Sequence, residues 1–74
     1  MTLASARIGK VYKILRIIGD DKEKRRLSDM GFTPDCKIYP EFKAPFGDTA
    51  LVRLRDFRVA LRIDAARLIE VEEA

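Results

Sequence analysis

Histidine and tryptophan are absent from this chain of 74 residues, and cysteine occurs only once, as Cys36. A single cysteine cannot form an internal disulfide, so the fold does not depend on an oxidising compartment. Zinc and ferrous sites draw on histidine, cysteine and carboxylate ligands, and here only Cys36 and scattered carboxylates remain. We therefore expect no metal site and no tight binding of ferrous iron or zinc. The lack of histidine also excludes a serine or cysteine nucleophile activated by an imidazole.

Long apolar runs are missing as well. No window approaches the roughly 20 apolar residues of a membrane-spanning helix, and residues 1–6 do not resemble a signal peptide. We expect a cytoplasmic protein that does not insert into membranes. The length leaves room for one domain, residues 1–74 with a core from 9 to 72, but not for a deep catalytic cavity. The chain is thus predicted to be non-enzymatic and to need no cofactor.

The charges are nearly balanced, with 15 Lys and Arg against 12 Asp and Glu and a net charge of +3. The basic excess lies in the first third of the chain, whereas the C-terminus is acidic at Glu70, Glu72 and Glu73. A basic flank suits a nucleic acid, an anionic membrane surface or an acidic protein partner. A solvated surface without a partner is the alternative for each of these charges taken singly.

A short helix that ends at Gly31 is predicted shortly before the middle of the chain. Asp20 can cap its first turn, with Glu23 three residues later in the arrangement of a capping box. Leu27 and Met30 share one face, and because so short a helix is unstable alone, this face must pack on the rest of the protein. Gly31 suits the left-handed position that follows a helix.

The opposite face of this helix carries a charged stripe, defined by Lys22, Arg25, Arg26 and Asp29. Lys22 and Arg26 are like charges four residues apart, which disfavours the helix unless a partner relieves the repulsion. Asp29 can offset part of this repulsion by pairing with Arg25. Contact with an acidic partner and plain solvation both remain open for the stripe.

The remainder of the chain predicts about five short strands, at residues 10–18, 36–44, 50–55, 59–63 and 68–71. In the second strand Ile38 and Phe42 are expected to share the buried face, and Pro40 places the strand at an edge or a bulge. A helical turn capped by Asp64 precedes the last strand. The predicted fold class is mainly β with a short α-helix after the first strand, in which the strands form a small closed or partly open barrel.

Two motifs carry a family resemblance: R-L-S-D-M-G-F-T-P at residues 26–34 and A-P-F-G-D at residues 44–48. In this order and at this spacing they resemble the ferrous iron transport protein A family, usually called FeoA. The resemblance extends from Gly9 to Val71 and implies an SH3-like barrel with a helix. Asp35 stands where the family usually has glycine; because Asp tolerates a left-handed backbone, the turn is expected to survive. Pro40 replaces an aliphatic residue that the family favours.

FeoA proteins are thought to act in bacterial ferrous iron uptake beside FeoB, a membrane transporter with a cytoplasmic G-protein domain. The resemblance therefore implies an accessory protein that binds the cytoplasmic part of a FeoB-type transporter. The candidate partner-binding residues are the charged stripe and Phe46, whose ring is either an exposed anchor or folds over the end of the barrel. They are Lys22, Arg25, Arg26, Asp29 and Phe46.

Two alternatives remain from other functional classes. The chain could be an SH3-like nucleic-acid-binding barrel, or an accessory domain of a transcription regulator. Nucleic acid is not the expected partner, because the arginines of the hairpin at residues 50–63 are not interleaved with enough exposed aromatic residues. A lone domain without a helix-turn-helix segment could not bind an operator by itself. Self-association into a homo-oligomer is left open.

Overall fold

The computed structural model describes all residues from Met1 to Ala74. Five strands, two α-helices and one 3-10 helix (η1) follow one another along the chain. Their order is η1 (Leu3–Ser5), β1 (Tyr12–Ile17), α1 (Asp21–Asp29), β2 (Lys37–Lys43), β3 (Thr49–Leu54), β4 (Phe57–Arg62), α2 (Ile63–Ala66) and β5 (Ile69–Glu73). The predicted number of strands is confirmed, and α1 lies between the first two of them.

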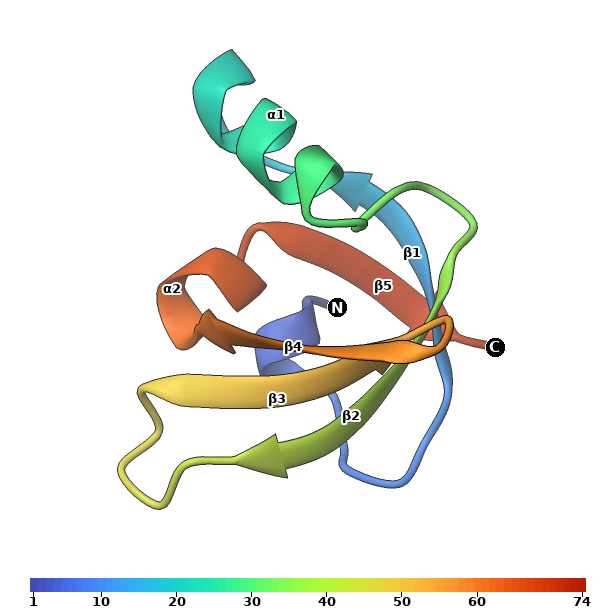
Figure 1. The fold of residues 1–74 in the computed structure, drawn as a ribbon, viewed down its shortest axis with the longest axis vertical. Coiled ribbons are helices and arrows are strands. Elements are labelled where there is room, and N and C mark those ends of the chain that lie inside the picture. The colour runs from blue at the N-terminus through green and yellow to red at the C-terminus, as the bar shows by residue number, and fades with distance from the viewer.

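All five strands belong to one antiparallel sheet with the order β4-β3-β2-β1-β5. The sheet is strongly twisted and curled, with α1 at one end of the molecule and the β2–β3 loop at the other (Figure 1). It does not close on itself, because β4 and β5 remain as two edges. Of the closed and partly open barrels that the sequence allows, the open form is the one found.

The core is one continuous cluster of 14 buried apolar side chains. Strand β3 contributes by strict alternation, as the sequence predicts, since Ala50, Val52 and Leu54 are buried. The N-terminal segment, for which the sequence indicated no structure, adds two members through η1 and the residue after it. The cluster consists of Leu3, Ala6, Tyr12, Ile14, Leu27, Phe32, Ile38, Ala50, Val52, Leu54, Leu61, Ala66, Ile69 and Val71.

A β-bulge next to Pro40 changes which side chains of β2 face the core. The register of β2 against β3 shifts between Pro40 and Phe42. Ile38 and Pro40 are buried, whereas Phe42 is 53% exposed. The prediction that Phe42 shares the buried face of Ile38 is wrong, because the extra residue of a bulge reverses the alternation. Pro40 does lie at a bulge, one of its two expected positions, although β2 is an interior strand.

Helix α1 begins and ends close to the predicted residues. Oδ1 of Asp20 accepts a hydrogen bond from the N–H of Glu23 at 2.9 Å, whereas the reciprocal bond of a capping box, from the N–H of Asp20 to the Glu23 side chain, does not form. At the other end the N–H of Phe32 donates to the C=O of Leu27 at 3.1 Å. With Gly31 at a φ of 107°, this bond makes a Schellman end that stops the helix.

Two contacts fix α1 against the sheet. Leu27 and Phe32 are 1% and 0% exposed and belong to the core, which confirms Leu27 as the anchor of the helix. Met30 is only half-buried, so it contributes less to this packing than the sequence predicts. Gly31 lies under the β3–β4 hairpin, where an added Cβ would stand 3.2 Å from the ring of Phe57. The end of α1 is therefore seated on the hairpin tip.

The second helix, α2, is a single turn between β4 and β5. Its N-cap position is Arg62, which makes no capping bond through its side chain. Asp64 lies inside the first turn and pairs with Arg67 at 3.5 Å, so its predicted capping role is wrong. Leu68 follows the helix and precedes β5, and its C=O accepts a hydrogen bond from the N–H of Ile18 at 2.6 Å. This bond ties the start of the α1 connection to the end of α2.

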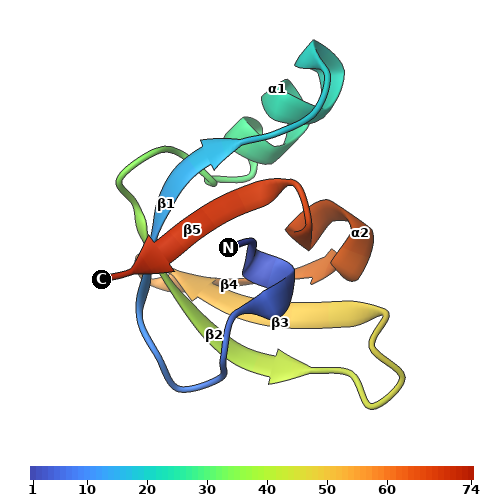
Figure 2. The same ribbon diagram turned by 180° about the vertical axis from the view of Figure 1, so that it is seen from behind.

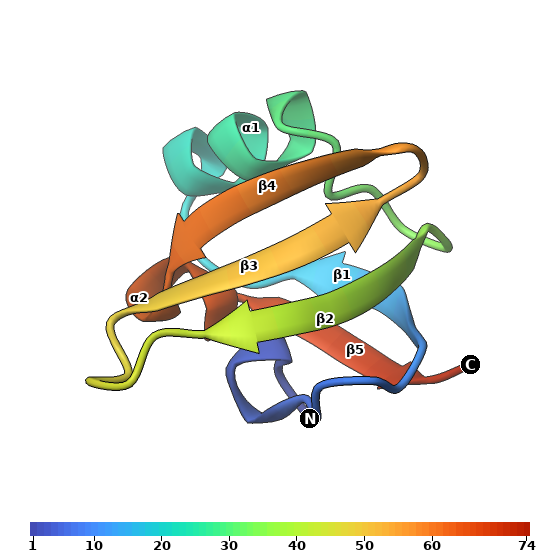
Figure 3. The ribbon, with the colours of Figure 1, turned by 60° about the horizontal axis from the view of Figure 1, so that its bottom comes forward.

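The two edges of the sheet differ in how they are covered. Strand β5 is bordered by the N-terminal segment, since Thr2 pairs with Glu70 and the N–H of Val71 donates to the C=O of Met1 at 2.8 Å (Figure 2). Strand β4 has no such neighbour: outside its ladder with β3, the one backbone group that is used is the C=O of Arg62, the N-cap residue of α2. Helix α1 runs beside this free edge (Figure 3).

Candidate partner-binding site

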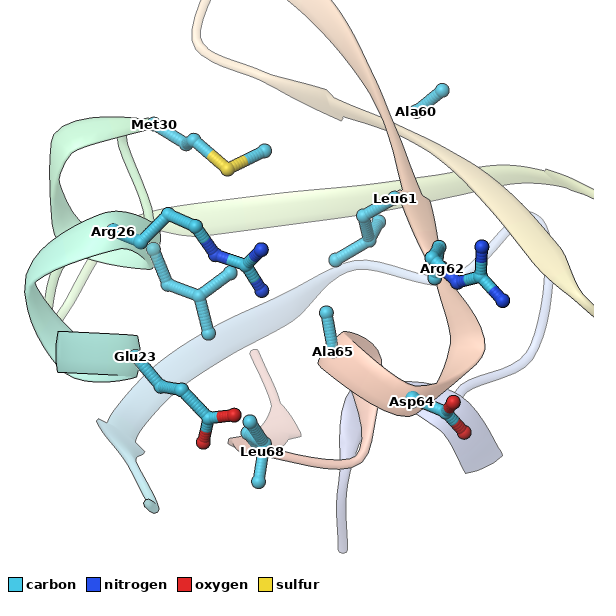
Figure 4. A pocket seen from close by; sticks show the side chains of 10 residues that line it. Glu23, Arg26, Met30, Ala60, Leu61, Arg62, Asp64, Ala65 and Leu68 are labelled. Atoms are coloured by element: carbon cyan, nitrogen blue, oxygen red, sulfur yellow. The ribbon is translucent and has the colours of Figure 1, made fainter. Parts of the chain in front are cut away.

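A groove of about 280 Å³ lies between α1 and the segment formed by β4 and α2 (Figure 4). This volume falls just below the roughly 300–1,000 Å³ of small-molecule pockets, so it suits one or two side chains of a partner. Met30 projects from α1 toward β4, and Leu68 closes the opposite end (Figure 4). The apolar lining comes from α1 and its C-cap, β4, α2 and the short link between α2 and β5: Leu27, Met30, Ala60, Leu61, Ala65 and Leu68.

The charged side chains of the groove are not mutually neutralised. Glu23, Arg26, Arg62 and Asp64 complete its lining. Asp64 is engaged by Arg67, whereas neither Arg26 nor Arg62 lies within ion-pair distance of a carboxylate. The guanidinium of Arg26 extends from α1 into the middle of the groove, while that of Arg62 points away from it (Figure 4). Beside its apolar lining, the groove thus presents two unpaired charges from α1, the guanidinium of Arg26 and the carboxylate of Glu23.

The charged stripe does not act as one unit. Lys22, Arg25 and Asp29 are exposed and lie outside the groove, and only Arg26 lines it. The expected pairing of Arg25 with Asp29 does not form, since the two charges lie beyond ion-pair distance of each other. Repulsion between Lys22 and Arg26 is therefore not offset within the helix.

Phe46 lies far from the stripe. Its side chain is 94% exposed in the β2–β3 loop, so the ring does not fold over the end of the sheet. Helix α1 and this loop occupy opposite ends of the longest axis of the molecule, which measures 30 Å (Figures 1 and 2). The structure thus brings Lys22, Arg25, Arg26 and Asp29 together on one helix but places Phe46 on a separate surface.

Several groove residues could not be found by sequence reasoning. Ala60, Leu61, Ala65 and Leu68 read as ordinary members of a strand or a helical turn, and nothing in their spacing relates them to α1. They meet Leu27 only because the curled sheet brings β4 beside the helix. In the sequence, only the charged stripe on one face of α1 indicated that this region could bind a partner.

Two of the four arginines of the β3–β4 hairpin, Arg53 and Arg58, are engaged within the protein. Glu41 accepts a hydrogen bond from Nε of Arg58 at 2.6 Å and lies 3.5 Å from Nε of Arg53. The Arg53 guanidinium also stacks over the ring of Tyr39 at 4.1 Å from its centroid. These contacts occupy two of the four positive charges and the aromatic face that a nucleic-acid strand would use on this hairpin.

No group of three or more histidine, cysteine, aspartate or glutamate side chains is close enough together to hold a metal ion. Cys36 is half-buried, and its Sγ lies 3.6 Å from the C=O of Lys37. Neither helix has the length and apolar content needed to cross a membrane.

The FeoA domain family matches residues 1–73 of this chain. The chain belongs to the FeoA family. Among solved structures, the FeoA-like protein from Clostridium acetobutylicum is 36% identical with a TM-score of 0.90; the match covers 99% of this chain and 85% of that one. None of the curated proteins compared with it matches.

Two further structures bear on fold and function. FeoA from Stenotrophomonas maltophilia, solved in complex with zinc, is 28% identical with a TM-score of 0.84, over 97% of this chain and 89% of that one. It is described as a procaryotic SH3 domain protein and was put forward as an activating factor of bacterial ferrous iron transport. A manganese-dependent transcriptional repressor is 23% identical with a TM-score of 0.89 and shows the shared fold alone. The match covers 100% of this chain but only 41% of the repressor.

The sheet of this FeoA protein is therefore SH3-like, as the family resemblance implied. The substitution of the family's usual glycine by Asp35 is accommodated as expected, because Asp35 adopts a φ of 69° in the left-handed region.

Proposed function

We propose that this FeoA protein is an accessory component of bacterial ferrous iron uptake that binds the cytoplasmic part of a FeoB-type transporter. The observation that carries the proposal is the groove between α1 and β4, an apolar surface with the free guanidinium of Arg26 at its centre. Arginine and large apolar side chains in a desolvated pocket are typical of the residues that dominate binding energy. The role put forward for the Stenotrophomonas relative supports the same conclusion.

The charged stripe contributes in a different way from the groove. Lys22 and Arg25 are exposed and without ion partners, and exposed charges mainly accelerate the encounter of two proteins. Phe46, on the far side of the molecule, is a second contact only if the partner extends along the 30 Å axis. We therefore assign the groove and the stripe to the primary contact and Phe46 to a secondary one.

Binding kinetics with the purified cytoplasmic part of a FeoB-type transporter test this function. Reversal of charge at Arg25 and Arg26 should slow association and make it less sensitive to salt. If the ring is a buried anchor in the complex, Phe46→Ala should raise the dissociation rate, with a loss of about 1–3 kcal/mol of binding free energy. Lys24→Glu, at an exposed position of α1 outside the stripe, is the matched control.

Two outcomes would contradict the proposal. If the wild-type protein does not bind the transporter at all, the accessory role is wrong. If it instead binds duplex DNA or RNA in a salt-dependent manner, the nucleic-acid or transcription-regulator alternative is the better explanation. Melting curves of all variants ensure that a loss of binding is not a loss of fold.

A further inference from the structure

The free edge of β4 has a defined set of unused backbone groups. In an antiparallel ladder, residues alternately direct their N–H and C=O toward and away from the neighbouring strand. Just past β4, the N–H of Ile63 donates to the C=O of Asp48 at 3.1 Å, in line with the register of β3 and β4. Every second residue before Ile63 therefore also faces β3. The three that turn their backbone outward are Arg58, Ala60 and Arg62; the C=O of Arg62 caps α2, so only its N–H is unused.

This contrast between the two edges points to a binding surface. Proteins normally protect edge strands, since unpaired backbone groups recruit other strands. Here β5 is protected by Met1 and Thr2, whereas the outward backbone groups of Arg58 and Ala60 and the N–H of Arg62 have no hydrogen-bond partner. The open edge also borders the apolar groove, to which β4 contributes Ala60 and Leu61. A strand added there would border the groove, with one or two of its side chains directed into it.

The charges around the edge favour an acidic occupant over a second copy of this chain. Two copies of β4 paired antiparallel about Ala60 would set Arg58 of one opposite Arg62 of the other, and like charges directly opposite are destabilising. Arg58 shares the single carboxylate of Glu41 with Arg53, and Arg62 has none. Arg26 adds a third positive charge from the facing wall, which the single carboxylate of Glu23 on that wall does not balance.

We propose that β4 accepts a sixth strand from the partner protein: an extended acidic segment that pairs with the outward backbone groups of Arg58, Ala60 and Arg62. An apolar side chain of this segment fills the groove, and a carboxylate pairs with Arg26. Strand addition of this kind takes affinity from the backbone bonds and specificity from the pockets for alternate side chains. The identity of the partner rests on the function proposed above, but the binding mode does not.

The first test removes one outward donor. Ala60→Pro deletes the N–H that faces away from β3, at an edge position where proline is tolerated, whereas Ala60→Ser keeps it. We expect Ala60→Pro to weaken binding about tenfold or more and Ala60→Ser by less than about twofold. In the wild-type complex, amide exchange at Arg58, Ala60 and Arg62 should slow on binding. That measurement decides the matter even if the proline variant fails to fold.

The second test separates the groove from the charged stripe. Arg26→Glu should weaken binding about tenfold at equilibrium, because its partner carboxylate is held in the groove. Arg25→Glu, one residue away on the exposed side of the same helix, should change the equilibrium constant by less than about twofold. Equal effects of the two variants would mean that the stripe, and not the groove, holds the partner.

Two ligands distinguish a failure of this binding mode from a failure of the proposed function. The first is the cytoplasmic part of a FeoB-type transporter, and the second is a displayed library of short random peptides. The binding mode is supported, even if the transporter does not bind, when the selected peptides are acidic, when they slow amide exchange at β4 and when Ala60→Pro no longer binds them. Transporter binding that leaves exchange at β4 unchanged overturns the mode and keeps the function. A dimer of this chain that Ala60→Pro abolishes would also overturn it, by placing a second copy at the edge.

Discussion

Replacement of Leu27 by alanine tests how α1 is held on the sheet. Leu27 is 1% exposed and is the only buried residue within the helix, so its side chain carries most of the packing of α1. Large-to-small changes at such positions typically lower the free energy of unfolding by about 2–5 kcal/mol. We expect a loss of about 3 kcal/mol, out of a total that for a domain of this size is on the order of 4–11 kcal/mol.

Met30→Ala provides the comparison within the same helix face. Because Met30 is only half-buried and borders the groove, we expect a loss of about 1 kcal/mol. Chemical denaturation gives both values, and the melting temperature of Leu27→Ala should fall by roughly 12–24 °C. Lys24→Ala, at an exposed position of α1, is the control and should change stability by less than about 0.5 kcal/mol.

A loss below about 0.5 kcal/mol for Leu27→Ala would refute this account of the helix. It would mean that α1 is held by its two ends rather than by Leu27. Amide exchange distinguishes a global effect from local opening, since opening of α1 alone would expose its amides while the sheet stays protected.

Three further substitutions test single features of the fold by denaturation. Asp20→Ala removes the oxygen that accepts the N–H of Glu23, and we expect a loss of about 1 kcal/mol. Gly31→Ala should lose about 1–3 kcal/mol, because the residue has a φ of 107° and the new methyl group would stand 3.2 Å from the Phe57 ring. Phe46→Ala should change stability by less than about 0.5 kcal/mol, because its side chain is 94% exposed.

Each of these expectations can fail in a recognisable way. Unchanged stability in Asp20→Ala would mean that water replaces the cap without loss. A Gly31→Ala protein as stable as the wild type would show that the hairpin tip moves to admit the methyl group. A large loss in Phe46→Ala would place the ring in contact with the sheet in solution.

The elements that the sequence predicts well are those governed by neighbours along the chain. The cap at Asp20, the end at Gly31 and the alternation of β3 depend on local hydrogen bonds and side-chain period, and all three are found. Phe42 was misplaced because a bulge changes register by one residue, and a sequence pattern does not locate that residue. The core contribution of Leu3 was missed because its partners are distant in sequence.

The candidate site was predicted only in part, for the same reason. The stripe on α1 follows from helical spacing, but the spacing does not separate Arg26, which lines the groove, from Arg25, which does not. That difference depends on where β4 passes, and β4 is brought beside α1 by the curl of the whole sheet (Figure 3). The free edge of β4 likewise becomes visible only once the strand order is known.

The pairing of β1 with β5 also has a kinetic consequence. It joins opposite ends of the chain, with Tyr12 opposite Glu73, whereas β2, β3 and β4 form a meander of neighbours. Closing the long loop between β1 and β5 loses chain entropy before any contact across it forms. We expect the meander to nucleate folding and the β1–β5 ladder to form after the transition state. Conservative core substitutions should then slow folding at Val52 but mainly speed unfolding at Val71, as kinetic measurements on the two variants would show.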